Sequence, residues 1–135
     1  MNRRRHLFRI ADLAQQLVGG FLLAGPFVVT EEVWTLAKHM GPVQTLLTIV
    51  IVAAIGYGTL YKADRNRDPE AEADVAGVPI RFVSLLLVAF GSVTILAFVF
   101  AAPETFEAGP AATVTAISLS AIFSVIGAAT ADTLF

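Results

Sequence analysis

Residues 24–36 read AGPFVVTEEVWTL, and this stretch places two adjacent acids, Glu31 and Glu32, directly after a run of residues suited to lipid. Pro26 interrupts the same apolar run. A chain that crosses hydrocarbon must satisfy its own backbone hydrogen bonds, so a span is usually a helix of about 20 apolar residues. The stretch therefore predicts a membrane helix that carries an interruption and two acids near one end.

The composition of the whole chain supports a membrane location. The 135 residues are 56% hydrophobic and 15% charged, whereas soluble domains average about 45–50% apolar and about 25% charged residues. The chain has no cysteine, which excludes disulfides, thiolate metal sites and a cysteine nucleophile. The two histidines, His6 and His39, lie at opposite ends of the first apolar segment, so a zinc site is not expected.

Four stretches are long and apolar enough to span a bilayer. They form two predicted helical hairpins, joined by a polar, acid-rich loop over residues 62–79 that we interpret as solvated, because its acids do not have the spacing of a calcium-binding loop. We therefore expect one transmembrane domain over residues 1–135, an all-α four-helix membrane bundle. The expected spans are residues 13–37, 42–61, 80–102 and 111–131.

The basic residues predict the orientation of this bundle. Lysine and arginine are enriched on the cytoplasmic side of membrane proteins, and in the predicted topology only Lys38 lies on the opposite side from the other eight. With Trp34 as the outer boundary of the first span, both termini are expected in the cytoplasm and the protein in the cell membrane as a multi-pass protein. The eight basic residues on the termini side are Arg3, Arg4, Arg5, Arg9, Lys62, Arg65, Arg67 and Arg81.

The first span carries the strongest candidate site. Pro26 cannot donate a hydrogen bond to the carbonyl of Leu22, so we expect a kink at Gly25 and Pro26. Interruptions of this kind often line ion sites in membrane proteins. The Leu22 carbonyl, the Thr30 hydroxyl and the Glu31 carboxylate are oxygen ligands suited to a hard cation or a proton, although no metal can be specified.

Helical periodicity suggests which way these groups face. At 100° per residue, Gln16, Gly20, Ala24, Phe27 and Glu31 fall on one polar or small-residue face with Asp12 on its flank, which favours packing inside the bundle or an oligomer. Asp12 and Asp132 are candidates for the cytoplasmic end of an ion path. Interfacial anchoring, with Lys38 as a partner of Glu31 and Glu32, is the structural alternative for the acid pair.

The run GGFLLAGPFVVTEEVW, residues 19–34, resembles the signature of a family of integral membrane proteins, the domain of unknown function 2391 type. The resemblance rests on Gly25, Pro26, Thr30, Glu32 and Trp34. It implies that the family's acid corresponds to Glu32, whereas helical periodicity favours Glu31, and both remain candidates. The family has no settled activity, so the resemblance implies a self-contained membrane module.

Two functions remain open. The favoured one is a small oligomeric channel or transporter for a cation or proton, with the acid pair of the first span at its outer mouth. The alternative is a non-transporting membrane subunit or scaffold that packs against a larger membrane partner. None of the common catalytic or nucleotide-binding signatures occurs in the chain, so we expect no enzyme activity, no cofactor and no nucleic-acid partner. Small-residue faces on several spans favour a homo-oligomer in the lipid bilayer.

The charge asymmetry predicts that reporter fusions at either terminus are cytoplasmic, because eight of the nine basic residues lie on that side in the predicted topology. The measurement is the activity of a reporter that functions only in the cytoplasm, fused to each terminus in turn and compared with a fusion at His39. A reporter that is active at His39 and inactive at the termini contradicts the orientation.

Overall fold

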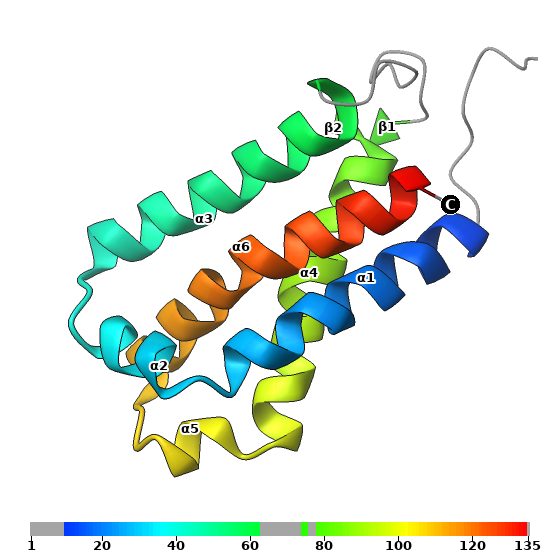
Figure 1. The fold of residues 1–135 in the computed structure, drawn as a ribbon. Helices are drawn as coiled ribbons and strands as arrows, with labels where there is room; N and C mark the ends of the chain where they lie inside the picture. The colour runs from blue at the N-terminus through cyan, green and yellow to red at the C-terminus, as the bar shows by residue number, and fades with distance from the viewer. Residues whose placement is uncertain (1–9, 63–73, 76–77, 135) are drawn as a thin grey trace, which may run out of the picture.

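The computed structural model describes residues 10–62, 74–75 and 78–134, and their fold is an all-α bundle (Figure 1). Four helices in it are long and apolar enough to cross a membrane, over Ile10–Val28, Pro42–Tyr61, Ile80–Val99 and Pro110–Asp132. The fold class and the four membrane-spanning helices predicted from the sequence are confirmed. The predicted polar loop, residues 62–79, falls mostly outside the described residues.

The helices are interrupted more often than predicted. The elements are α1 (Ile10–Val28), α2 (Glu31–Lys38), α3 (Pro42–Tyr57), a π-helical turn η1 (Gly58–Lys62), α4 (Ile80–Val99), α5 (Ala102–Thr105) and α6 (Pro110–Leu134). A short antiparallel pair, β1 (Asp74–Val75) and β2 (Val78–Pro79), precedes α4. The first predicted span, 13–37, is thus two helices, and the third, 80–102, ends at Val99.

The interruption of the first span lies after Pro26 rather than at it. Pro26 is inside α1, and the helix ends at Val28 before Thr30 adopts an extended conformation with ψ of 122°. Two side chains replace the backbone N–H donors that are missing where the helix ends. The Thr30 hydroxyl donates to the Pro26 carbonyl at 2.6 Å, and Trp34 Nε1 donates to the Val28 carbonyl at 2.8 Å. These bonds satisfy carbonyls that a buried helix end leaves free.

The break also explains the position of the acid pair. Glu31 and Glu32 form the first turn of α2, and Lys38 lies in its last turn. Acids near the N-terminus and a base near the C-terminus both interact favourably with the helix dipole. Trp34, predicted at the lipid–water boundary, is instead fully buried and stacks on Phe106 with ring centroids 5.7 Å apart. The start of α2 is therefore fixed to the bundle by its tryptophan.

Helix α6 is the central element of the bundle. It packs against α1, α2, α3 and α4, and Figure 1 shows it lying between α3 and α1. The start of α1 and the end of α6 lie at one end of the bundle, which we call the terminal end. Helices α2 and α5 lie at the opposite end, which we call the α2 end (Figure 1).

Helices α1 and α6 approach each other at two glycines. A Cβ atom built on Gly19 meets the backbone oxygen of Gly127 well inside contact distance, and a Cβ on Gly127 meets the oxygen of Gly19 in the same way. No side chain fits between the two backbones there. Small residues allow such close packing of membrane helices, where dispersion contacts replace the hydrophobic effect as the driving force.

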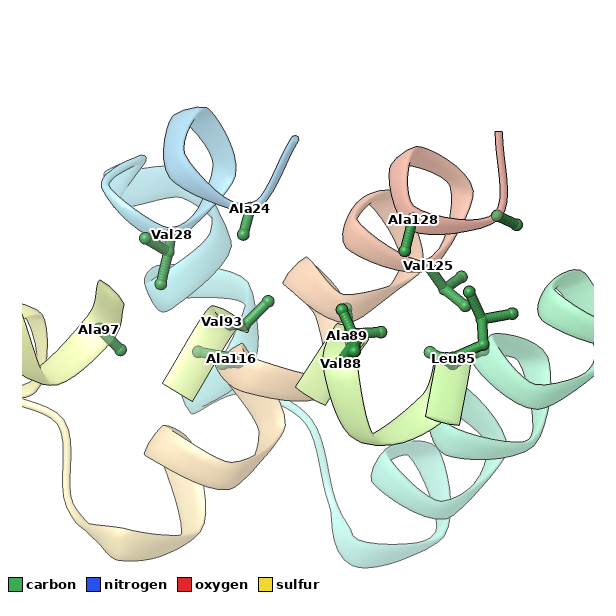
Figure 2. Packing of buried hydrophobic residues seen from close by; sticks show 14 of the residues in the cluster. Ala24, Val28, Leu85, Val88, Ala89, Val93, Ala97, Ala116, Val125 and Ala128 are labelled. Carbon is green, nitrogen blue, oxygen red and sulfur yellow. The ribbon is translucent and has the colours of Figure 1, made fainter. Parts of the chain in front are cut away.

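The rest of the core is built from small aliphatic residues of three helices. Figure 2 shows Ala24 and Val28 of α1 turned towards Val93 of α4, while Ala128 and Val125 of α6 lie near Ala89 and Leu85 of α4. All seven are fully buried. The middle of the three-helix seam is therefore filled with protein.

Helix α3 is attached to the outer face of this core. The hydroxyls of Thr45 and Thr115 lie 2.6 Å apart and join α3 to α6. At the other end of α3, the ring of Tyr57 meets Phe82 of α4 edge to face at 5.5 Å. The opposite face of α3 exposes large apolar side chains, which suits contact with lipid. They are Val43, Leu46, Leu47, Ile49, Val50 and Ile51.

The glycine contact predicts that Gly127→Ala lowers the free energy of unfolding by about 1–3 kcal/mol, because the new methyl group must push the α1 backbone away. The matched control is Gly91→Ala, since a Cβ on Gly91 meets nothing within 4 Å. The measurement is thermal unfolding in detergent. Equal stability of the two variants would show that α1 and α6 are not in this close contact.

Candidate functional site

A buried cluster of charged side chains lies at the terminal end of the bundle. Arg81 Nη1 donates to both carboxylate oxygens of Asp132, at 2.7 and 2.9 Å. Its Nη2 donates to Asp12 Oδ2 at 3.2 Å. The side chains of Arg81, Asp12 and Asp132 are 5%, 11% and 0% exposed. We call this group, together with Gln16 and Ser84, the ion cluster.

The ion cluster is assembled from three different spans. Asp12 is in the first turn of α1, Arg81 in the first turn of α4, and Asp132 near the end of α6. The antiparallel packing of α1 and α6, fixed at Gly19 and Gly127, brings the start of one helix beside the end of the other. Arg81 then bridges them from α4.

Gln16 and Ser84 complete the hydrogen bonding of the cluster. Gln16 lies one turn after Asp12 on α1, and its Nε2 donates to Asp132 Oδ2 at 3.1 Å and to the Arg81 carbonyl at 3.4 Å. The Ser84 hydroxyl donates to Gln16 Oε1 at 2.7 Å. Each polar atom of the Gln16 side chain thus has a partner, which is what a fully buried amide requires.

Charges held this deep are expensive. Removing two ions from water costs several kcal/mol each, and their attraction repays this only with good geometry and further hydrogen bonds. Ionisable groups inside membrane spans are rare and mark ion or proton pathways in many transporters. Carboxylates, an amide oxygen and a hydroxyl are also hard oxygen ligands. The ion cluster is therefore a candidate site, in which the structure adds Arg81 and Ser84 to the predicted residues Asp12, Gln16 and Asp132.

A second polar layer lies deeper in the same three-helix seam. The Ser124 hydroxyl of α6 donates to the Gly20 carbonyl of α1 at 3.0 Å. A Cβ on Gly20 would meet Ser92 Oγ of α4 at 3.0 Å, so that serine also borders the layer. Ser120, one helical turn along α6 from Ser124, is fully buried, and its hydroxyl has no hydrogen-bond partner among the described residues.

At the α2 end, Glu31 and Glu32 are exposed rather than directed into the bundle. The two acids line a pocket of about 400 Å³ with Thr35, Leu36 and His39. Glu31 also lines a second pocket, of about 260 Å³, with Lys38 and Glu107 among its walls. The predicted helical face holds for Asp12, Gln16, Gly20 and Ala24, which are buried, and ends at Val28 because the helix ends there.

The other predicted site residues separate into two groups. Leu22 is 68% exposed on the outside of α1, and Thr30 bonds to the Pro26 carbonyl, so the expected oxygen site between Leu22, Thr30 and Glu31 is not assembled. Asp12, Gln16 and Asp132 do come together. Among the described residues, no three His, Asp or Glu side chains are placed to hold a metal ion.

Sequence reasoning missed Arg81 as a site residue. It follows the polar loop at the start of α4, and the charge distribution predicts it only as one of the basic residues on the cytoplasmic side. A usable signal was present: Arg81 begins an uninterrupted apolar stretch and lies within the expected span 80–102, where a charge requires a buried partner. Its acid partner lies 51 residues away in the chain.

The chain belongs to the DUF2391 family, whose model carries the description "Putative integral membrane protein" and matches residues 2–134. The match confirms the resemblance seen in the first span and extends it over almost the whole chain, including all three helices of the ion cluster. Neither the curated proteins nor the solved structures gave a match. The protein is therefore an integral, multi-pass membrane protein.

Proposed function

We propose that the protein moves a proton or a monovalent cation across the cell membrane, with Asp12 and Asp132 as the groups that bind it. The observation that carries this proposal is the burial of two carboxylates against one arginine among three membrane-spanning helices. Buried charge of this kind is costly to maintain and is retained in transporters because it binds the transported ion.

Further polar groups mark the proposed route between the ion cluster and the α2 end. The layer of Gly20, Ser92 and Ser124 offers oxygen atoms deeper in the seam, and Ser120 adds a buried hydroxyl one turn further on. At the α2 end, Glu31 and Glu32 attract cations to the outer mouth. With the termini in the cytoplasm, the path leads from this mouth to the ion cluster on the inner side.

The proposed mechanism is a carrier rather than an open pore. Ala24 and Val28 of α1 are fully buried between the layer of Gly20 and the acid pair at the α2 end, so the transported species passes only when helices move. Movement of one group of helices against another around a fixed site is a common mechanism of small transporters. A homo-oligomer stays part of this proposal, because small-residue faces of the kind predicted on several spans let membrane helices pack closely.

Flux from purified protein in liposomes tests the proposal, read with a pH-sensitive dye for protons and with ion-selective dyes for sodium and potassium. The parent is expected to conduct, and Asp12→Asn to reduce the rate by about tenfold or more, equal to a barrier change of about 1.4 kcal/mol or more. Glu31→Gln and Glu32→Gln are expected to reduce the rate less, because both acids are exposed.

The matched control is Glu104→Gln. It removes an exposed acid at the α2 end that lines neither of the two pockets beside Glu31, and it is expected to conduct like the parent. Each variant is first checked for folding by size-exclusion chromatography. A folded parent that moves none of the three ions would contradict transport and favour the non-transporting membrane subunit. Parental flux from folded Asp12→Asn would remove Asp12 from the path.

A further inference from the structure

Arg81 occupies the same carboxylate oxygens that a transported cation needs. Its guanidinium touches both oxygens of Asp132 and one of Asp12. Within the part of the chain that the structure describes, the charged groups bonded to it are Asp12 from α1 and Asp132 from α6. Tyr61 of η1 is also buried. A guanidinium stays charged under all physiological conditions, so it cannot make way by losing a proton. It can make way only by moving.

The two ion pairs of Arg81 are unequal. Asp132 is fully buried and receives two short bonds from Arg81 and a third from Gln16. Asp12 lies at the start of α1, is 11% exposed, and is reached at 3.2 Å. Asp12 is therefore the carboxylate that a cation displaces the guanidinium from more easily, because the contact there is longer and the side chain is not fully buried.

The packing indicates which helix moves with the arginine. Helices α1 and α6 are locked together by the backbone contact at Gly19 and Gly127 and by the bond from Ser124 to the Gly20 carbonyl. Helix α4 packs less closely against α1 than α6 does, because a groove of about 490 Å³ lies between α4 and α1. The groove is bordered by Leu17, Leu87 and Gly91. Helix α4 thus has room to shift against the α1–α6 pair.

We infer that Arg81 is an internal competitor of the transported proton or cation, and that binding at Asp12 and Asp132 displaces it and releases the start of α4 from the α1–α6 pair. The inference rests on the proposed function and assigns Arg81 as a positioning residue that sets affinity. The cation and the guanidinium cannot bind the carboxylates at the same time. Each therefore weakens the binding of the other by the same factor. The described structure is the state in which the arginine occupies the carboxylates.

Distance measurements between spin labels test the movement. The chain has no cysteine, so introduced cysteines are labelled specifically. Ala14→Cys with Leu87→Cys reports on α1 and α4, and Ala14→Cys with Thr130→Cys reports on the locked α1–α6 pair; all three positions are exposed. On lowering the pH or adding sodium or potassium to proteoliposomes, the first distance is expected to change and the second to stay constant.

Two variants separate competition from a merely structural role. Arg81→Gln removes the competitor and is expected to lower the half-saturating concentration of the transported ion by about tenfold, within the usual range of coupling between sites. Asp12→Asn keeps the Arg81–Asp132 pair, which protects the fold, and removes one of the two carboxylates that the ion needs, so its α1–α4 distance is expected to respond less to the transported ion than that of the parent. The half-saturating ion concentration and the spin-label distance are both measured on variants that elute from size-exclusion chromatography at the same volume as the parent.

The outcomes distinguish this inference from the proposed function. Parental flux with unchanged half-saturation in Arg81→Gln, or an α1–α4 distance that never responds to the transported ion, would overturn the competition and leave transport standing. If Arg81→Gln does not fold, the distances in the parent and in Asp12→Asn decide. A parent that conducts nothing but whose α1–α4 distance responds to protons would overturn transport and retain the displacement of Arg81.

Discussion

One guanidinium joins the three central helices of this membrane protein. Arg81 reaches from α4 to Asp132 on α6 and Asp12 on α1, and the three side chains are almost completely buried. Each of these charges would be costly without the others, so their helices must meet in one register. Gln16 and Ser84 fit the same register, since their hydrogen bonds exist only when α1 and α4 are level. The ion cluster therefore fixes both the fold and the chemistry of the terminal end.

The close contact of Gly19 with Gly127 has a complementary role. It lets α1 and α6 pack as a unit through their backbones, while the contact of α4 with that unit combines small aliphatic residues with ion pairs. Backbone contacts between glycines have one geometry, whereas ion pairs can exchange partners. This difference is the basis of our proposal that α1 and α6 form a rigid pair while the attachment of α4 depends on what binds the carboxylates.

Several features of the fold could be predicted from the sequence because they are local. Length and hydropathy located the four spans, and the 3.6-residue period placed Asp12, Gln16, Gly20 and Ala24 on the buried face of α1. The same period failed beyond Val28, because Thr30 and Trp34 satisfy the free carbonyls and allow a second helix to start at Glu31. The pairing of Arg81 with Asp132 could not be predicted, since nothing in one sequence records which acid meets a given base 51 residues away.

The central claim is that Arg81 and Asp132 form a buried pair on which the packing of α4 depends. A double-mutant cycle with Arg81→Gln, Asp132→Asn and the combined variant measures this most directly, as the free energy of unfolding in detergent. Residues in direct contact are coupled by about 0.5–3 kcal/mol, so the account predicts that the second substitution costs little once the first is present. If the double variant loses as much unfolding free energy as the two single variants lose together, the two side chains do not meet.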